Sequence, residues 1–445
     1  MSDVSIIGSG YVGLCTGVCL ANRGYNVILS DIDEKKVDLI NRGVPPLYDP
    51  KLEAMLRHVR DSGNLKAVNR NEEAVLNSDL TFICVGTPSR PSGKIDLGYV
   101  KNAAREIGEI LARKKSYHLV VVKSTVVPGT TEKLVKPAVE KASGGKAGSD
   151  FGLAMNPEFL REGNSIRDTL EPNRVIIGEY DEKSGDILKH FYEDFYEGKN
   201  PIILRMNLSS AEMVNYANNA FSAMKISFID ELAGICEKIE GMNIDLIAKG
   251  IWLDGRASPK FLEASPGCGG SCFPKDVRAL ITFSDEVKCK TRLLKAVVEL
   301  NGMQADHVVS IMEEELNKLE DKTIAALGLS FKPETDDIRE SPAMRIIDNL
   351  LSRKARVKVY DPRAMENTRG VYGGRIGYAR NAVECITGAD CCVLVTHWKE
   401  FLNLSPETYA IRMKTPVLID TRRLYDAEKY RKILRYRAIG IGLKV

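Results

Sequence analysis

Two cysteines and three glycines stand together in the stretch SPGCGGSCFPKD, residues 265–276. Cysteines in soluble proteins mostly lie in apolar surroundings and take no part in chemistry. Here glycines remove side chains from around Cys272, while Lys275 and Asp276 place charge beside it. Backbone amides and a nearby cation favour the thiolate, which is the nucleophilic form of a cysteine. The stretch is therefore unlike the surroundings of a core cysteine, and it raises the question of what a thiol would do in such a loop.

A second glycine-rich stretch, IIGSGYVGLCTG, predicts a dinucleotide site near the N-terminus. Gly8, Gly10 and Gly13 follow an apolar strand directly and open a helix. The first glycine allows a tight turn, and the second lets the backbone approach a pyrophosphate at the helix N-terminus. Asp31 ends the next strand, where a carboxylate accepts from ribose hydroxyls and repels a 2′-phosphate. NAD is therefore favoured over NADP, although Lys36 nearby would suit NADP.

The elements that position these motifs follow an α/β pattern at both ends of the chain. Apolar strand patterns alternate with helical patterns in the first 200 residues, and the alternation returns from Thr323 onward. Such alternation is typical of doubly wound parallel sheets. Strands are expected at 4–8, 26–32, 80–86, 119–125, 151–156 and 174–179, and in TIAALGL (323–329), RVKVYD (356–361), CCVLVTH (391–397), PVLIDTR (416–422) and AIGIG (438–442).

The segment between the two sheets is expected to be helical. One long helix is predicted over about 209–240, with Ser209 and Glu212 as a capping box. A second helical stretch should run to about Trp252, and another from Lys275 to about Asn317. An apolar stripe at heptad-like spacing predicts a core or dimer face on the long helix. The stripe consists of Met213, Ala217, Phe221, Met224, Phe228, Leu232 and Ile235.

The fold class is therefore α/β, with two Rossmann-like doubly wound domains joined by a central all-helical segment that contains a long helix. We place the NAD-binding domain at 1–205, the central helical and dimerisation domain with the cysteine loop at 206–317, and the second Rossmann-like domain at 318–445. The cysteine loop would lie between two nucleotide-binding-like domains, where an active site is expected.

Bulk composition excludes several classes of protein. A chain of 445 residues predicts two or three domains. Its 63 basic and 60 acidic residues nearly cancel, so no nucleic-acid surface is indicated. No apolar run approaches the ~20 residues of a membrane span. We expect a cytoplasmic protein with reduced cysteines and no metal, because no signal peptide pattern and no C-x-x-C pair is present.

Several longer motifs are similar to those of the nucleotide-sugar 6-dehydrogenases, in the same order and over nearly the full chain. They are GSGYVG (8–13), VGTP (85–88), KSTVVPGT (123–130), NPEFLREG (156–163), DGRASPKFL (254–262), GGSCFPKD (269–276) and FKPETDDIRESP (331–342). The resemblance implies oxidation of a sugar C6 alcohol to a carboxylate with reduction of two NAD. A thiolate would convert the intermediate aldehyde to a thiohemiacetal, its oxidation would leave a thioester, and water would release the acid. The resemblance assigns that thiolate to Cys272.

The same resemblance assigns roles to other side chains. Glu158 matches a general acid/base for thioester hydrolysis, and Thr125 and Asp276 would hold or activate water. Asn219 matches the residue that hydrogen-bonds the C6 oxygen and stabilises an alkoxide. Arg256 matches an arginine that reaches the substrate of a neighbouring subunit, which implies a homodimer or a larger homo-oligomer.

The ligand contacts follow from the glycine motif and the resemblance together. The expected cofactor-binding residues are Gly8, Gly10, Tyr11, Val12, Gly13, Asp31, Lys36, Thr87, Ser124, Thr125, Glu162, Lys275 and Arg339. The expected substrate-binding residues are Glu158, Phe159, Leu160, Asn215, Asn219, Arg256, Phe261, Gly269, Phe331, Lys332 and Arg422.

UDP-glucose is the expected substrate and UDP-glucuronate the expected product, because the DGRASPKFL stretch favours them. GDP-mannose is the main alternative, since GGSCFPKDVRAL also resembles that group of the family. Enzymes for UDP-N-acetylhexosamines more often carry histidine where this chain has Ser271. Outside the class, the alternative is a non-catalytic protein that binds NAD or a nucleotide sugar.

Three positions depart from the family pattern. The family usually has a lysine four residues before Asn219, and this chain has Asn215 there. Removing one such donor typically reduces turnover by ~10²–10³-fold, so we predict that Asn215→Lys raises turnover. Cys268 stands where an aromatic residue is common, and we interpret it as a small substitute and not a second nucleophile. The tripeptide RAS at 256–258 replaces the usual Arg-Ile-Gly.

Overall fold

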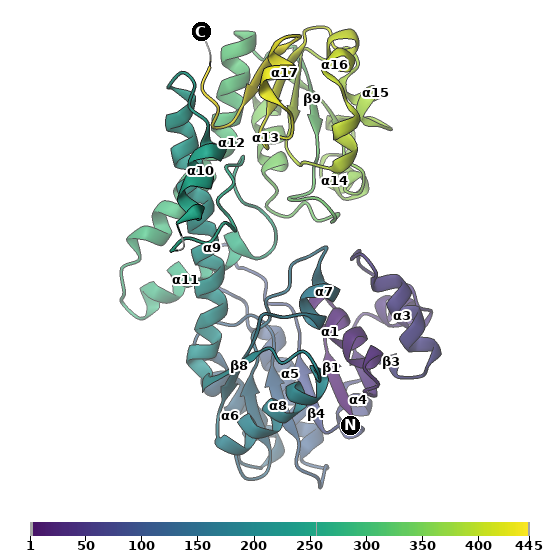
Figure 1. The fold of residues 1–445 in the computed structure, drawn as a ribbon. Helices are drawn as coiled ribbons and strands as arrows, with labels where there is room; N and C mark the ends of the chain where they lie inside the picture. Colours follow the sequence, from purple (N-terminus) through teal and green to yellow (C-terminus); the bar gives the residue numbers. More distant parts are fainter. Residues whose placement is uncertain (1–2, 255, 444–445) are drawn as a thin grey trace. The chain divides into compact units, whose positions relative to one another are not determined.

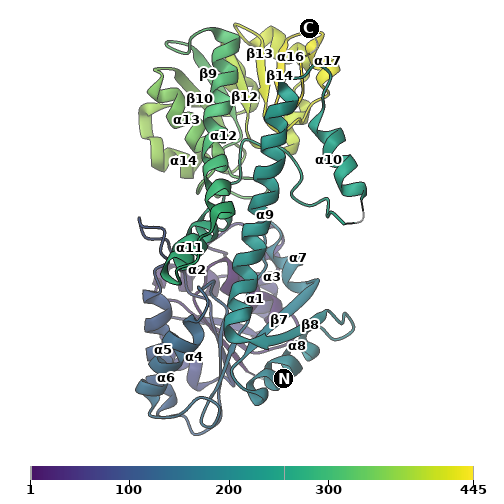
Figure 2. The ribbon, with the colours of Figure 1, turned by 90° about the vertical axis from the view of Figure 1, so that its left-hand side faces the viewer.

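The computed structural model describes residues 3–254 and 256–443. The chain divides into two compact units, Met1–Asn218 and Asn219–Val445, and each is described by itself (Figure 1). Helix α9 (Leu208–Glu237) begins in the first unit and continues as one helix into the second (Figure 2). No helix in the described ranges is long and apolar enough to cross a membrane.

The first unit contains an eight-stranded sheet in the order β3-β2-β1-β4-β5-β6-β7-β8. All neighbouring strands are parallel except β6 and β7, which are antiparallel. The strands are β1 (Val4–Ile7), β2 (Val27–Ser30), β3 (Leu65–Val68), β4 (Leu80–Ile83), β5 (Leu119–Val122), β6 (Gly152–Met155), β7 (Arg174–Glu179) and β8 (Ile202–Asn207). The direction of chain order reverses between β1 and β4, and ligands of open α/β sheets bind at such a point.

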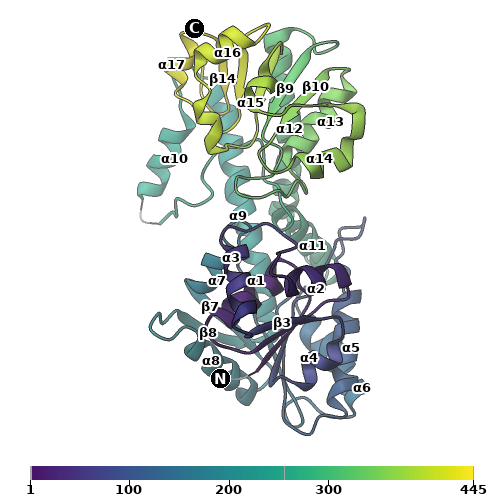
Figure 3. The same ribbon diagram turned by 90° about the vertical axis from the view of Figure 1, so that its right-hand side faces the viewer.

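Helices cover both faces of this sheet. Helices α1 (Tyr11–Asn22), α3 (Leu52–Asp61) and α8 (Glu182–Phe195) bury apolar side chains against one face. Helices α4 (Asn71–Leu76), α5 (Gly98–Leu111) and α6 (Lys136–Ser143) cover the other, where α5 and α6 lie side by side (Figure 3). The remaining helices of this unit are α2 (Glu34–Asn41), η1 (Thr131–Val135) and α7 (Ser165–Leu170).

The second unit contains a six-stranded parallel sheet in the order β11-β10-β9-β12-β13-β14. Its strands are β9 (Thr323–Leu327), β10 (Arg356–Tyr360), β11 (Gly377–Tyr378), β12 (Cys391–Leu394), β13 (Val417–Asp420) and β14 (Arg435–Ala438). Numbered within each sheet, the first six strands of both units follow the order 3-2-1-4-5-6 of dinucleotide-binding sheets. The predicted fold class of two Rossmann-like sheets is confirmed.

Four helices form the central segment: α9, α10 (Ile244–Leu253), α11 (Phe273–Glu286) and α12 (Arg292–Leu316). With α13 (Pro342–Ser352), parts of α9, α10 and α12 bury one face of the second sheet. Helices α15 (Ala382–Ile386), α16 (Pro406–Arg412) and α17 (Ala427–Arg431) cover the other face. The unit also contains α14 (Met365–Tyr372), η2 (Gly373–Arg375) and η3 (Lys399–Asn403).

Several predicted element boundaries were wrong. Strands β3, β8 and β11 were not predicted, and of AIGIG only Ala438 belongs to a strand, as the last residue of β14. The helix predicted over 275–317 is two helices, because the chain turns at Lys288 with a φ of 58°. The capping box was also wrong. The side chain of Asn207 accepts from the Ser210 N–H at 2.8 Å, and the Glu212 carboxylate binds a different segment of the chain.

Candidate active site

The glycine turn after β1 is built to accept a ligand close to its backbone. Gly8 has a φ of +101°, and a Cβ there would lie 2.7 Å from the Cys84 carbonyl oxygen, so only glycine fits. A Cβ at Gly13 would lie 1.9 Å from the Gly8 carbonyl oxygen, which explains the close approach of α1 to the turn. Around Gly10 no heavy atom of the described structure lies within 4 Å of a Cβ position. This open cradle at a helix N-terminus fits a dinucleotide pyrophosphate.

Asp31 follows β2 at the same edge of the sheet. One carboxylate oxygen accepts from the Ser9 N–H at 2.8 Å and from the Ser9 hydroxyl at 2.6 Å, and the other accepts from the Asp33 N–H at 3.0 Å. Burial raises the pKa of Asp31, but these hydrogen bonds and the charge of Lys36 outweigh burial and hold it below its usual value. Asp31 is therefore ionised at neutral pH and fits the role of ribose acceptor.

Other predicted cofactor residues lie on this unit too. The half-buried Thr87 follows β4. The Ser124 hydroxyl donates to the Val85 carbonyl oxygen at 2.7 Å, and the Tyr11 hydroxyl donates to the Tyr48 carbonyl oxygen at 2.9 Å. Val12, on α1, packs against the core, and Glu162 is half-buried before α7. These hydroxyls fix the loops that surround the glycine turn.

Glu158 follows β6 and is half-buried. One of its carboxylate oxygens accepts from the N–H of Leu160 at 2.6 Å, which holds the side chain against its own loop. The guanidinium of Arg174 stacks 4.3 Å from the centre of the Phe159 ring, and this contact fixes the residue next to Glu158.

Sequence reasoning missed a buried cation beside this loop. The Lys123 ammonium donates to the Asn156 amide oxygen at 2.7 Å. Burial lowers the pKa of Lys123, while the negative charge of Glu158 acts in the opposite direction. Both residues fall within motifs of the resemblance, so the signal was present in the sequence but no role had been given to them.

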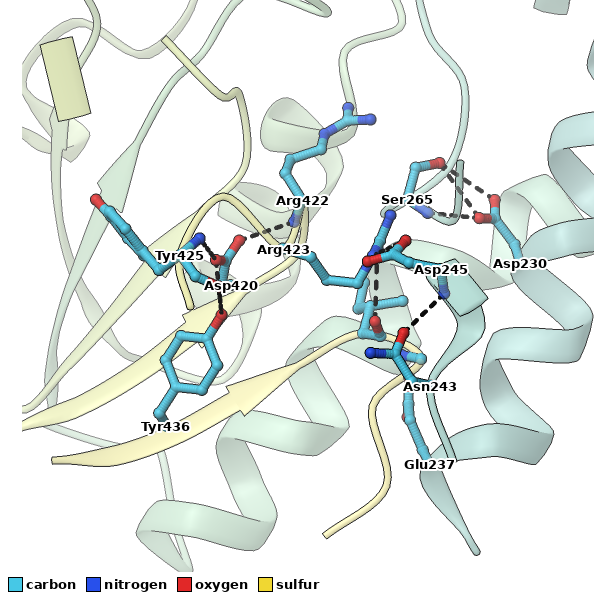
Figure 4. Close-up of polar contacts among 12 residues, drawn as sticks. Asp230, Glu237, Asn243, Asp245, Ser265, Asp420, Arg422, Arg423, Tyr425 and Tyr436 are labelled. Carbon is cyan, nitrogen blue, oxygen red and sulfur yellow. Dashed lines mark hydrogen bonds and ion pairs between the residues drawn. The ribbon is translucent and has the colours of Figure 1, made fainter. Parts of the chain in front are cut away.

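In the second unit, the cysteine loop is held at four points. The Ser265 N–H donates to the buried Asp230 carboxylate at 2.6 Å (Figure 4). Asn301 on α12 accepts from the Cys268 N–H at 2.7 Å and donates to its carbonyl oxygen at 3.1 Å. The Gly270 N–H donates to the Arg339 carbonyl oxygen at 3.0 Å, and Cys272 ends the loop at the start of α11.

Two glycines of this loop have no room for a side chain. A Cβ at Gly269 would lie 2.5 Å from the Glu340 carbonyl oxygen, and one at Gly270 would lie 2.8 Å from the Phe331 ring. Gly270 also has a φ of +86°. The loop therefore packs directly on the FKPETDDIRESP segment, which carries Phe331 and Arg339.

Cys272 is the N-cap residue of the 14-residue helix α11 and is half-buried. The partial positive charge of a helix N-terminus stabilises a thiolate. The Ser271 hydroxyl oxygen lies 3.6 Å from the Cys272 sulfur. Cys268 differs: burial raises the pKa of its thiol to about 12, and it packs against an apolar cluster that includes Val277 and Val297.

Asp276, one turn into α11, joins three predicted site residues. Its carboxylate accepts from the Asn219 amide at 2.7 Å through one oxygen and from the Lys275 ammonium at 2.5 Å through the other. The Asp276 N–H donates to the Cys272 carbonyl oxygen at 2.8 Å. Lys275 therefore pairs with Asp276, and the helix N-terminus is the element that favours the Cys272 thiolate. Asn219, Lys275, Asp276 and Cys272 form one connected group within this unit.

The basic side chains predicted for the ligands have different surroundings. Lys332 lies 5.5 Å from the centre of the Phe331 ring. Arg339 is exposed and pairs with Asp337 at 2.7 Å. The half-buried Arg422 donates through Nε to the Val395 carbonyl oxygen at 2.8 Å. Its neighbour Arg423 points the other way and pairs with Asp245 at 2.8 Å (Figure 4), so Arg422 is the better candidate for a ligand contact.

Two further predicted residues, Arg256 and Phe261, lie on the segment between α10 and the cysteine loop. Arg256 is highly exposed and forms an ion pair with its near neighbour Asp254. Phe261 has a φ of 66° and its ring packs edge-on against that of Phe273, with 5.5 Å between centres. The side chain of Arg256 is therefore largely open to solvent.

Known proteins with similar sequences are dehydrogenases of one family. Three models of the UDP-glucose/GDP-mannose dehydrogenase family match: the NAD binding domain at residues 2–196, the central domain at 209–303 and the UDP binding domain at 325–427. The UDP-glucose 6-dehydrogenase AglM of Haloferax volcanii is 41% identical, over 95% of this chain and 97% of the relative.

Two solved structures are also similar. A UDP-glucose dehydrogenase from the archaeon Pyrobaculum islandicum has a TM-score of 0.92 and 37% identity, and the match covers 99% of this chain and 98% of the other. A UDP-D-ManNAc dehydrogenase from Pyrococcus horikoshii has a TM-score of 0.87 and 28% identity, over 98% and 99% of the two chains.

A dinucleotide cradle with an ionised ribose acceptor, on a chain with two Rossmann-type sheets, defines an NAD-dependent dehydrogenase. The family matches cover most of the chain and agree with the close relative and the solved structures. The chain belongs to the UDP-glucose/GDP-mannose dehydrogenase family.

Proposed function

We propose that this enzyme oxidises UDP-glucose to UDP-glucuronate in two successive two-electron steps, with Cys272 as the nucleophile. The observation that carries the proposal is the position of Cys272 at the N-cap of α11, with the Asp276–Asn219 hydrogen bond one turn away. A nucleophilic thiol lets a dehydrogenase take an aldehyde on to the acid, because the thiohemiacetal carries a hydrogen that can leave as hydride. UDP-glucose is favoured among substrates because relatives that act on it are 41% and 37% identical, whereas the UDP-D-ManNAc dehydrogenase is 28% identical.

NAD would be held by the glycine turn and by Asp31, and when bound it supplies the acceptor for hydride. Gly8, Gly10 and Gly13 give the pyrophosphate access to backbone N–H groups. Thr87, Ser124 and Glu162 stand on loops of the same unit, and Lys275 and Arg339 are the proposed contacts from the second unit.

In the first oxidation, Asn219 would donate to the C6 oxygen while that oxygen carries developing negative charge. Its amide is oriented by Asp276, which accepts from it at 2.7 Å. The resulting aldehyde is attacked by the Cys272 thiolate, so a new S–C6 bond forms and the carbonyl oxygen takes a proton. This thiohemiacetal carries the hydrogen that the second oxidation removes, and a thioester remains.

Hydrolysis of the thioester completes the reaction. Water attacks C6, the S–C6 bond breaks, and the carboxylate leaves with a proton released to a base. Glu158 is proposed as that base, and Thr125 and Asp276 are proposed to hold the water. Lys332, Phe331 and Arg422 are proposed to hold the nucleotide sugar, since a guanidinium and an ammonium suit a diphosphate.

We also propose a homodimer that forms through helix α9. Phe221, Phe228 and Ile235 recur at seven-residue spacing on this helix and are 59%, 48% and 52% exposed. An apolar seam of this kind favours association with a second copy. Arg256, which is exposed and pairs with Asp254, would then reach the substrate of the partner subunit. All ten cysteines are free thiols, which supports the cytoplasm as the place of action.

A substrate panel tests this function. UDP-glucose, GDP-mannose and UDP-N-acetylhexosamines are each incubated with NAD or NADP, and NADH absorbance is followed. We expect UDP-glucose with NAD to give the highest kcat/KM. A higher value with GDP-mannose or an N-acetylhexosamine would reassign the substrate within the family. No reduction with any nucleotide sugar would overturn the enzymatic function and favour a binding protein.

A further inference from the structure

Helix α9 is fastened to the loop after β5 by two side chains on one helix face. Asn215 is 2% exposed, and its amide Nδ2 donates to the Thr125 hydroxyl oxygen at 3.2 Å. Glu212, three residues earlier, accepts from the Thr131 N–H at 2.7 Å and from the Thr131 hydroxyl at 2.6 Å. Residues three apart share a helix face, so α9 grips this loop at both Thr125 and Thr131.

The Glu212 contacts make this attachment rigid. The carboxylate is fully buried and also accepts from the Gly129 N–H. It therefore supplies acceptors to the backbone donors at the start of η1, which otherwise have none within a helix. A loop fixed in this way cannot move freely relative to Asn215, and the Asn215–Thr125 hydrogen bond is held in place.

The polarity of the Asn215 contact fixes the orientation of Thr125. The amide nitrogen can only donate, so the threonine oxygen is the acceptor in this bond. One lone pair of the Thr125 oxygen is therefore occupied by Asn215. The hydroxyl proton and the second lone pair point away from Asn215. Thr125 is half-buried, so part of the residue remains accessible to a small molecule such as water.

We propose that Asn215 is a positioning residue for thioester hydrolysis, which acts by orienting the Thr125 hydroxyl toward the attacking water. The inference rests on the proposed function, in which Thr125 holds that water. In the step, one water O–H bond breaks, an O–C6 bond forms, the S–C6 bond breaks, and the proton passes to the base while the thiol is regenerated. Asn215 itself exchanges no proton in this role and acts through its hydrogen bond to Thr125.

This role differs from that of the lysine that relatives usually carry at this position, which stabilises an alkoxide during oxidation. The two roles predict different slow steps. Loss of an alkoxide donor slows the first hydride transfer, whereas loss of the Thr125 contact slows hydrolysis and lets the thioester accumulate. A displacement of a reacting group by about 1 Å can cost about 100-fold in rate, so we expect hydrolysis in Asn215→Leu to slow about 10- to 100-fold.

The test combines rapid-quench mass spectrometry with a double-mutant cycle. Wild type, Asn215→Leu, Thr125→Val and the double variant are mixed with UDP-glucose and NAD, and the intact protein mass is measured over time. We expect Asn215→Leu to accumulate a UDP-glucuronyl adduct on Cys272 after release of two NADH per active site. We also expect the double variant to be no slower than Thr125→Val, because residues that act as a unit are non-additive.

Ser227→Ala serves as a matched control. Ser227 is buried on the same helix, and its hydroxyl donates to the Val297 carbonyl oxygen at 3.3 Å, away from the loop after β5. The Ser227→Ala variant should therefore show the same level of the Cys272 adduct as wild type. If Asn215→Leu folds poorly, Asn215→Asp keeps the shape and removes the donor, and it should give the same adduct. An additive double variant, or slow NADH formation with no adduct, would overturn the inference. If wild type itself forms no NADH, the proposed function fails instead.

Discussion

Asp31 offers the sharpest test of the cofactor site. Its carboxylate lies after β2 and is fixed by Ser9 and Asp33. Asp31→Asn preserves the shape of the side chain, and the amide oxygen can keep the two bonds from Ser9. The amide nitrogen is then a donor that faces the Asp33 N–H, which lies 3.0 Å from the present oxygen. The change therefore removes the charge and one acceptor without opening a cavity.

The expected magnitude follows from the lost acceptor. A hydrogen bond to a charged group contributes about 1.5–3 kcal/mol, which corresponds to about 10- to 150-fold in Kd. NAD binding should weaken by an amount in this range. NADP should bind more tightly than to wild type, because a carboxylate and a phosphate about 5 Å apart repel each other by about 1–3 kcal/mol at intermediate screening. The preference for NAD over NADP should fall by at least about 60-fold in total.

Calorimetric titration of both cofactors measures the two dissociation constants directly. Asp38→Asn is a suitable control, because Asp38 stands on the adjacent helix α2 and is exposed, with Arg42 at 3.3 Å. The control should bind NAD as wild type does. Dissociation constants for NAD and NADP that both stay at their wild-type values in Asp31→Asn would refute the assignment of Asp31 to the ribose. Equal weakening of both cofactors would instead indicate damage to the glycine turn through Ser9.

Further predictions concern the thiol, the lysine position and the pH dependence of stability. Cys272→Ser should abolish UDP-glucuronate formation while NAD binding stays within about twofold, since the thiol acts only after the aldehyde forms; product analysis by mass spectrometry checks this. Asn215→Lys keeps a donor for Thr125 and adds charge, so kcat should rise; steady-state kinetics with no gain in the folded variant would count against it. Burial, together with the charge of Lys114, lowers the pKa of His118 to about 3 in the folded chain, below the value of about 6.5 expected when unfolded. The His118 imidazole is therefore neutral in the folded chain between these two pH values. Its contribution to the free energy of unfolding is fully present above pH 6.5 and declines as the pH falls toward 3. Between pH 7.5 and 5.5 wild type should lose about 1.4 kcal/mol relative to His118→Gln in urea unfolding; identical losses in both proteins would contradict this.

The strands that could be predicted from the sequence are those in which a continuous apolar run marks a buried strand. Strands β1, β4 and β5 are buried on both faces and read as continuous apolar runs. Strand β8 was missed because its residues alternate in exposure at the sheet edge, with Ile202 73% exposed. The break between α11 and α12 was missed because no glycine or proline marks it, and the chain turns at a lysine instead.

The candidate site was predictable in its residue types but not in its connections. The spacing of Gly8, Gly10 and Gly13 with Asp31 was sufficient to place the dinucleotide cradle. The capping box failed because a contact 81 residues away in sequence, to Thr131, competes successfully for the Glu212 carboxylate. Local patterns carry no information about such long-range partners. The pairing of Lys275 with Asp276, and of Asn215 with Thr125, likewise became visible only in three dimensions.

The central claim is that one thiol carries the sugar between two oxidations. The most direct measurement is the number of NADH formed per molecule of UDP-glucose when the sugar nucleotide is limiting and NAD is in excess. The account predicts two NADH and one UDP-glucuronate for wild type, and no UDP-glucuronate for Cys272→Ser. One NADH per UDP-glucose, with the aldehyde as final product, would contradict it, as would full conversion by Cys272→Ser.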